Sequence, residues 1–416
     1  MLIINGKDND DSADNEYGIG GVIMRTLSFP DIAGKKGLFV DGDWIEKKDQ
    51  DAKGKVRLIQ LADIGSGAFL DKSDRYITED KACELHCTFL RKGDVLIARL
   101  GEPICKCCLF PFEGNYITAV DVAILRIGRD DINPKYLVYL INSPWFKNRA
   151  KEFESGTTRK RISRKNMEKI LLPFPSLDEQ ARIVARIEEL FSELDAGVDT
   201  LQKIKQQLSV YRQAVLKEAF DQCSEFVAFG TITESRLGKM LDQEKNIGTP
   251  HKYLRNINVR WFSFDLSDML EMRIAEDELD KYSIQKGDLV ICEGGEPGRC
   301  AVWQDDERIF YQKALHRVRF KDDSNPLFYM YYLWHAAQIG RLNPFFTGTG
   351  IKHLTGQSLV KVPVPNIGRL QQDKTVSEIE TRLSLCDDIE KTVDQALQQS
   401  AAMRQSILKQ AFEGGL

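Results

Sequence analysis

Apolar residues recur at alternating steps of three and four along one stretch of the chain. They are Ile187, Phe191, Leu194, Val198, Leu201, Ile204, Leu208, Tyr211 and Val215. This spacing is typical of a coiled-coil seam and covers about four heptads. The helix that carries it, from about Asp178 to Phe220, would be roughly 65 Å long at about 1.5 Å per residue. A helix of that length cannot bury its apolar stripe on one small domain.

A second and more polar seam lies near the end of the chain. It consists of Ile379, Leu383, Cys386, Ile389, Val393 and Leu397, and it is diluted by Gln395, Gln398, Gln399 and Ser400. Each stripe could pack against its own domain. The helix lengths favour a second arrangement, in which the two helices pair antiparallel and hold two globular parts apart. The polar seam would then leave a face for another subunit.

Shorter patterns precede each predicted helix and indicate strands. Residues 56–61 alternate between apolar and polar and then meet the turn-prone sequence Gly65-Ser66-Gly67. Further strand-like runs lie at 94–98, 120–127, 253–259, 289–292 and 315–320. A short helix is expected after Asn133-Pro134 and again after Asn325-Pro326, because proline suits the first helical turn. Strands followed by helices at the edges predict the α+β fold class.

The chain repeats itself at an offset of 190 to 194 residues. The repeated landmarks are 92–97 with 286–291, the Gly-Glu-Pro at 101–103 with that at 295–297, 155–157 with 347–349, 172–175 with 362–365, and 212–217 with 404–409. We therefore expect a mobile arm at 1–22, a mixed domain at 23–176, a helix at 177–222, a second mixed domain at 223–366 and a second helix at 367–416. A duplicated chain suits a partner that has two related half-sites.

Composition narrows the class of protein. A hydrophobic content of 42% and a charged content of 29% are typical of a globular chain. With no apolar run long enough for a membrane span, no signal peptide and nine irregularly spaced cysteines, we expect a cytoplasmic protein with reduced thiols and no membrane contact. A net charge of −4 argues against a simple electrostatic nucleic-acid binder. It leaves room for a locally basic face or for cationic partner subunits.

Two groups of residues contain side chains that can bind metal ions, but their sequence patterns are weak evidence for a metal site. Thiolates at Cys83, Cys87, Cys105, Cys107 and Cys108 could bind zinc, but the second copy has only two cysteines in that region. Asp71 followed by Glu79 and Lys81 loosely resembles a nuclease cluster, although such triplets are common in charged loops. No phosphate-binding loop, dinucleotide motif, His-Glu-x-x-His or adenine methyltransferase motif occurs. We expect no catalytic residues and no metal site in this chain.

A basic loop ends the first mixed segment and gives the clearest candidate for binding. Its candidate residues are Thr157, Thr158, Arg159, Lys160, Arg161, Arg164 and Lys165. Cations interleaved with hydroxyls suit contacts with DNA phosphates and base edges. The matching residues of the second copy are Thr349, Lys352 and His353, beside two glycines that let backbone N–H groups approach phosphates. Arg99 and Arg299 follow buried strands and are further candidates. A solvated surface loop or an ordinary turn would give the same patterns.

Several of these segments together carry a family resemblance. They are residues 92–99, 172–180, 183–184 and 188–191, with 236–240 and 253–259 in the second copy. Over about residues 30–416 the chain resembles the specificity (S) subunit of type I restriction–modification systems. The resemblance implies two tandem target recognition domains, each recognising half of a bipartite double-stranded DNA site. It also implies that the paired helices set the distance between half-sites and dock two methyltransferase (modification) subunits.

The resemblance further implies that this chain has no catalytic activity and binds no cofactor. S-adenosylmethionine, ATP and Mg²⁺ would belong to the methyltransferase and restriction/translocase subunits. One departure concerns residues 366–372, which lack the Glu-Gln found at 179–180, so we expect the two helices to dock partners unequally. Two alternatives stay open. One is the recognition subunit of a related system that cuts on both sides of a bipartite site, and the other is a stand-alone Mg²⁺-dependent nuclease.

Overall fold

The computed structural model describes residues 16–19, 22–242 and 246–413. Contacts divide the chain into two compact units, the first formed by Met1–Leu201 with Gln395–Leu416 and the second by Gln202–Asp394. The limits expected from the sequence kept each long helix separate, whereas the contacts assign part of each helix to each unit. Most of the expected mobile arm lies outside the described residues. The described part of this arm includes β1 (Glu16–Ile19), which pairs antiparallel with β2 (Val22–Leu27).

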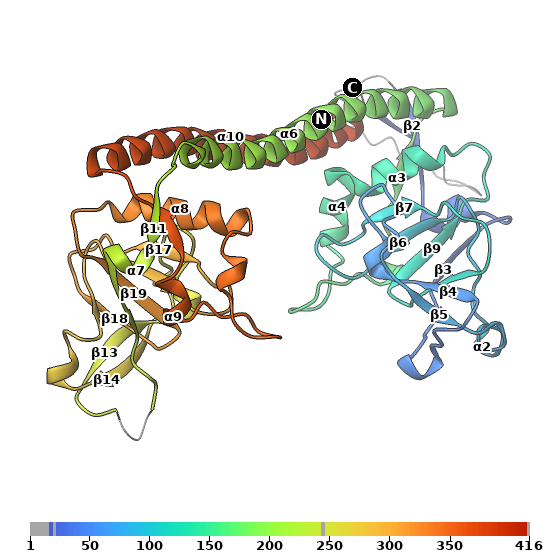
Figure 1. Cartoon of the computed structure of the whole chain (residues 1–416). Helices are drawn as coiled ribbons and strands as arrows, with labels where there is room; N and C mark the ends of the chain where they lie inside the picture. Colours follow the sequence, from blue (N-terminus) through green and yellow to red (C-terminus); the bar gives the residue numbers. More distant parts are fainter. Residues whose placement is uncertain (1–15, 20–21, 243–245, 414–416) are drawn as a thin grey trace. The chain divides into compact units, whose positions relative to one another are not determined.

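The first unit contains three small sheets (Figure 1). The antiparallel main sheet has the order β3 (Leu38–Asp41), β9 (Val122–Arg126), β6 (Val95–Ala98) and β7 (Cys107–Leu109). A second sheet has the order β5 (Arg75–Ile77), β4 (Val56–Ile59) and β8 (Tyr116–Thr118), and β10 (Leu172–Phe174) pairs with β2. Successive residues of β6 enter two different apolar clusters, so the strand is buried on both faces. Burial on both sides explains its uninterrupted apolar sequence.

Short helices cover the first unit. They are α1 (Phe29–Ala33), α2 (Glu79–Glu84), α3 (Pro134–Asn142), α4 (Pro144–Lys151) and α5 (Arg164–Met167). Helix α3 begins as expected, with Pro134 in its first turn and the Asn133 side chain accepting hydrogen bonds from two backbone N–H groups. Its apolar residues join the core of the main sheet. The structure therefore places α3 between this sheet and the first long helix.

The second unit repeats this plan. Its main sheet has the order β12 (Thr233–Leu237), β19 (Leu315–Phe320), β16 (Leu289–Cys292) and β17 (Cys300–Val302). A second sheet has the order β14 (Leu270–Ile274), β13 (Thr249–Leu254), β18 (Ile309–Tyr311) and β15 (Ser283–Ile284). Strand β11 (Phe226–Ala228) pairs with β20 (Pro363–Pro365). The short helices of this unit are α7 (Phe229–Ile232), α8 (Pro326–Gln338) and α9 (Gly356–Leu359). The strand expected at 253–259 instead ends at Leu254, where a 3₁₀ turn (Asn256–Asn258) follows.

The repeated Lys-Gly-Asp motif has the same structural role in both units. Asp94 accepts a hydrogen bond from the Arg91 backbone N–H and forms a two-bonded ion pair with Arg126, at 2.7 and 2.8 Å. Asp288 does the same with Gln285 and Arg319. Both aspartates are almost completely buried. A buried carboxylate needs such partners, so this motif recurs for reasons of folding.

The two long helices are α6 (Leu177–Asp221) and α10 (Arg369–Glu413). Within the second unit Arg212 pairs with Asp387 while Lys205 pairs with Asp394, so rising numbers on α6 meet falling numbers on α10. The helices therefore pair antiparallel, as predicted. Most seam positions are buried or half-buried, but Tyr211 and Ile389 are 40% and 38% exposed, contrary to the expected seam. Their sequence neighbours Arg212 and Glu390 form an ion pair at 2.8 Å.

A buried glutamine fixes the start of each long helix. The Gln180 amide accepts a hydrogen bond from the Asn133 backbone N–H at 2.9 Å and donates to Pro175 O at 2.9 Å. In the second unit the Gln372 amide accepts from Asn325 N–H at 2.7 Å and donates to Ile367 O at 2.7 Å. The departure noted at 366–372 therefore keeps the glutamine and both of these hydrogen bonds. Of the Glu-Gln pair at 179–180, only the glutamate is replaced in the second copy, where Gln371 stands at its position.

These findings confirm the predicted fold class. The chain is α+β, with two tandem domains of one design and two long helices that pair antiparallel. Among the residues described, no helix is long and apolar enough to cross a membrane.

Candidate nucleic-acid interface

The basic loop of the first unit is a short hairpin. Ser155 and Arg161 exchange both backbone hydrogen bonds, at 2.8 and 2.9 Å. Gly156 has φ +92°, and a Cβ atom there would lie 2.4 Å from the Arg159 carbonyl oxygen. This position therefore requires glycine. The tip residues Thr157, Thr158, Arg159 and Lys160 are all exposed, so the hairpin holds the predicted side chains in solvent.

The second unit builds the same hairpin from a different sequence. Thr347 and His353 exchange backbone hydrogen bonds of 2.8 and 2.9 Å. Gly348 has φ +99°, and a Cβ atom there would lie 2.3 Å from the Ile351 carbonyl oxygen. Its exposed tip carries Thr349, Gly350, Ile351 and Lys352, with Ile351 73% exposed. One backbone shape thus presents two different sets of side chains.

Backbone hydrogen bonds attach each hairpin to the end of a central strand. Ile162 N–H donates to Arg99 O at 3.0 Å, just after β6, and Leu354 N–H donates to Glu293 O at 2.7 Å, just after β16. The Arg99 side chain is only 5% exposed and pairs with Asp41 at 3.2 Å. It also donates to the Val120 carbonyl oxygen, and burial lowers its pKa. Arg99 braces the hairpin from inside the domain and does not face solvent.

The other predicted cations differ in how they are paired. Arg161 pairs with Asp121 at 3.1 Å and Lys160 with Glu154 at 3.3 Å. Arg164 is half-buried and pairs with Glu168 at 2.5 Å. Within the part of the chain that the structure describes, the exposed Arg159, Lys165 and Lys352 side chains have no ion pair. In the second unit Arg299 is 15% exposed and pairs with Glu296 at 3.0 Å.

The sequence patterns missed an exposed apolar residue that recurs after a matching β-bridge in each unit. Trp44 is 70% exposed and Met240 is 56% exposed. Each follows a parallel β-bridge, Asp43 with Ala119 in the first unit and Lys239 with Gln312 in the second. Ala119 of the first bridge lies on the turn between β8 and β9, and the same turn carries Asp121, which pairs with Arg161. A single exposed aromatic residue in a polar segment has no periodicity, so only comparison of the two folds reveals the pair.

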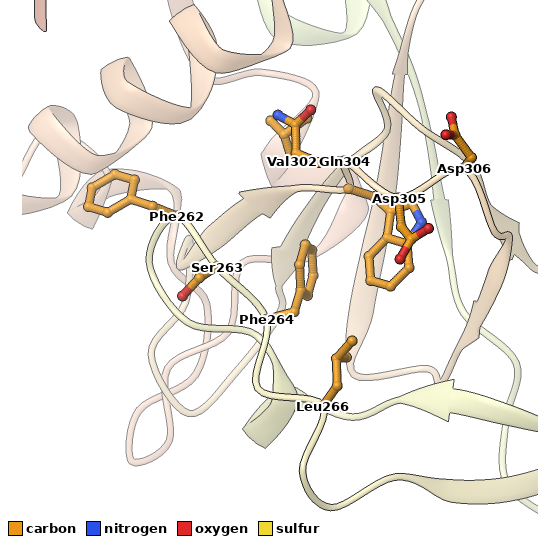
Figure 2. Close-up of a pocket in the computed structure, with 9 residues that line it drawn as sticks. Phe262, Ser263, Phe264, Leu266, Val302, Gln304, Asp305 and Asp306 are labelled. Carbon is orange, nitrogen blue, oxygen red and sulfur yellow. The ribbon is translucent and has the colours of Figure 1, made fainter. Parts of the chain in front are cut away.

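A separate cavity of about 540 Å³ lies in the second unit (Figure 2). Phe264 packs edge-to-face on Trp303 with ring centroids 5.1 Å apart, and the positive φ of 69° at Phe262 places its ring against Trp334. Asp305 and Asp306 also line this cavity. Two carboxylates without a lysine or arginine among the described lining residues repel a polyanion. We therefore do not assign this cavity to a nucleic-acid interface.

The residues considered for nuclease and zinc chemistry are dispersed. Asp71 pairs with Arg57 at 2.5 Å, Lys81 pairs with Glu84 at 2.7 Å, and Glu79 accepts a hydrogen bond from Asn115 at 3.0 Å. In the described ranges, no three His, Cys, Asp or Glu side chains could together hold a metal ion. The cysteines are free, and burial raises the pKa of the Cys105 and Cys108 thiols to about 12. Neither cluster gives a site for chemistry.

Comparisons with known proteins support the resemblance drawn from the sequence. The sequence model of the type I restriction modification DNA specificity domain matches residues 36–209 and 236–399. The EcoKI specificity subunit of Escherichia coli (strain K12) is 25% identical over 303 residues, which cover 68% of this chain and 65% of that protein. The StySPI specificity subunit of Salmonella potsdam is 25% identical over 316 residues, covering 68% and 66%. The matches thus span just under two thirds of these relatives.

Solved structures show the same fold. A chain from a study of complex assembly and conformational transition of the type I restriction–modification system has a TM-score of 0.71 and 16% identity, covering 96% of this chain and 100% of that chain. The HsdS subunit from Thermoanaerobacter tengcongensis has a TM-score of 0.56 and 16% identity, covering 97% of this chain and 100% of that one. At this identity the likeness concerns the fold alone.

Proposed function

This chain belongs to the type I restriction modification DNA specificity domain family, and we propose that it is the DNA-recognition subunit of a type I restriction–modification complex. Each unit would recognise one half of a bipartite site in double-stranded DNA. One observation carries the proposal, namely that the same hairpin is built twice with different exposed tips. The two alternatives, a both-sides cutting system and a nuclease, have no comparable support. We place this activity in the cytoplasm.

The hairpins would contact both the phosphates and the base edges of the DNA. Arg159 is exposed and unpaired among the described residues, so it can approach a phosphate or the acceptor edge of a guanine. Ile351 and Thr349 in the second unit offer an apolar surface and a hydroxyl, which suit a thymine methyl group or a polar base edge. The exposed Trp44 and Met240 would add apolar contacts in each unit. Arg99, being buried, would position the first hairpin without touching DNA.

The paired helices would dock the methyltransferase subunits. Exposed apolar side chains lie along them, with Val210 66%, Leu385 59% and Met403 52% exposed. The pairing has an internal two-fold pattern, because Arg212 with Asp387 repeats as Arg404 with Asp195. Such a pattern suits two copies of one partner. Methyl transfer from S-adenosylmethionine, and ATP- and Mg²⁺-dependent translocation and cleavage, would belong to the methyltransferase and restriction subunits, and this chain would contribute no catalytic centre of its own.

An exchange of hairpin tips tests the proposal. Gly350→Thr with Ile351→Arg converts the second tip to the first, and a Cβ atom at Gly350 meets nothing within 4 Å. The complex with its methyltransferase subunit should then methylate a site altered in one half only, as mapped by sequencing methylated genomic DNA. The reverse exchange, Thr158→Gly with Arg159→Ile, should alter the other half. Methylation without sequence preference, or methyl transfer by this chain alone, would contradict the proposal.

A further inference from the structure

A second cavity lies beneath the first hairpin and has a different character from that of Figure 2. It has a volume of about 550 Å³ and is enclosed by α4, the loop at 101–104, the hairpin and α10. Its charged and amide-bearing lining includes Lys147, Lys151, Lys160, Glu102, Glu154 and Gln405. All of these residues belong to the first unit. Three cations from two separate segments thus meet around one opening.

Lys147 is the partly buried cation of this cavity that lacks a partner among the described residues. Its side chain is half-buried, and burial lowers the pKa of its ammonium group, as does the neighbouring Lys106. Lys160 is compensated by Glu154 at 3.3 Å. Lys147 has neither an ion pair nor a side-chain hydrogen bond within the described ranges. A partly desolvated cation without a partner is unfavourable unless an anion occupies the space beside it.

In the second unit, apolar side chains lie against the corresponding Gly-Glu-Pro loop. There the Gly-Glu-Pro loop continues to Gly298, where a Cβ atom would lie 2.8 Å from Leu342 and 3.9 Å from Leu354. Leu342 is 1% exposed and joins the core of that unit, and Phe345 packs against the same core. In the first unit, lysines line the cavity beside this loop.

We propose that this cavity binds a backbone phosphate of the DNA that the first unit recognises. The proposal rests on the proposed function. Lysine ammonium groups bind phosphate as point charges, and neutralising a phosphate releases condensed counterions. Lys160 belongs both to the cavity and to the hairpin tip. A phosphate held there would fix the hairpin against the DNA backbone and so set the register of its tip residues.

The variant Lys147→Gln in the complex with the methyltransferase subunit tests this site. We expect it to bind cognate and non-cognate duplexes alike about tenfold more weakly, and to reduce the salt slope of log Kd by about 0.9. Thermal unfolding checks that the variant is folded, and it should melt no lower than the wild type because an unpaired charge is removed. Lys36→Gln is the matched control, because exposed Lys36 lies at the end of β3 opposite to Asp41. It should change neither affinity nor slope.

Duplexes with a single methylphosphonate at successive positions give a second readout. The wild-type complex should lose affinity when the contacted phosphate is made neutral, whereas Lys147→Gln should no longer sense that position. A variant with the wild-type salt slope, or with the wild-type methylphosphonate profile, overturns the inference. So does weaker binding of the methyltransferase subunit with unchanged DNA affinity, since the cavity would then serve a protein partner. A wild-type complex that binds no duplex at all would instead refute the proposed function.

Discussion

The two hairpins share a backbone shape and differ at two of their four exposed tip residues. In both, a glycine at positive φ closes the turn and a pair of backbone hydrogen bonds closes the base. The tips carry Thr-Thr-Arg-Lys in the first unit and Thr-Gly-Ile-Lys in the second. The forces that shape each hairpin act on the backbone, so tip residues can change without changing the fold. The following predictions test how far this separation between scaffold and recognition surface holds.

The largest expected effect concerns the buried ion pairs of the scaffold. Asp94→Ala should lower the free energy of unfolding by about 3–5 kcal/mol, because it leaves Arg126 without its carboxylate in a buried setting. Asp288→Ala should cost less, because Arg319 is 39% exposed and can reach water. Denaturant unfolding followed by circular dichroism measures both. Asp74→Ala at an exposed position is the control. Equal losses for the two variants would mean that exposure of the arginine does not matter.

The hairpin glycines should show a smaller and more local effect. Gly156→Ala and Gly348→Ala each place a Cβ atom within 2.4 Å of a backbone oxygen at positive φ, which costs roughly 1–3 kcal/mol. We expect weaker DNA binding by the complex and little change in overall melting, because only the hairpin is deformed. Gly368→Ala, outside both hairpins, is the control, since that position has open space. Unchanged DNA affinity in both glycine variants would remove the hairpins from the interface.

Free and paired cations of the first hairpin should contribute unequally to DNA affinity. Arg159→Ala should reduce the salt slope by about 0.9, as expected for one phosphate contact. Arg161→Ala should reduce it less, because Arg161 already pairs with Asp121 at 3.1 Å. Fluorescence anisotropy at several salt concentrations measures both slopes. If Arg161→Ala has the larger effect, its pairing with Asp121 does not persist on DNA.

The smallest expected effect is a difference in pH dependence between the units. In the first unit burial raises the pKa of Asp43 to about 6 from 3.8, so its contribution to stability is full below 3.8 and is lost as pH rises through 6. In the second unit burial lowers the pKa of His316 from 6.5, so its contribution is present above 6.5 and is lost as pH falls. Hydrogen-exchange protection factors, which correct for the intrinsic exchange rate at each pH, should therefore change in opposite directions in the two units between pH 5 and pH 7. Asp43→Asn and His316→Gln should each abolish the change in one unit.

The sequence was enough to find the architecture because architecture leaves repeated marks. Apolar steps of three and four located both long helices, and the recurring Lys-Gly-Asp and Asn-Pro motifs located β6, β16, α3 and α8. The same logic failed for Tyr211 and Ile389, which fit the seam pattern but are exposed. Tyr211 instead accepts a hydrogen bond from Arg382 of the other helix at 3.1 Å, and its neighbour Arg212 forms ion pairs with Asp387 and Glu390 there. A pattern along one helix contains no information about such partners.

Candidate residues were harder to predict because a side chain's role depends on its surroundings. Among the sequence candidates, the exposed Arg159 and the buried Arg99 differ only once the fold is known. Trp44 and Lys147 were not candidates at all, because neither belongs to a charged run or a periodic stripe. The sequence by itself determined that two similar domains and two long helices exist, because local spacing and repetition encode them. Only the tertiary structure decided which cations face solvent, which brace the hairpin and which meet around a cavity, because those outcomes depend on residues distant in the chain.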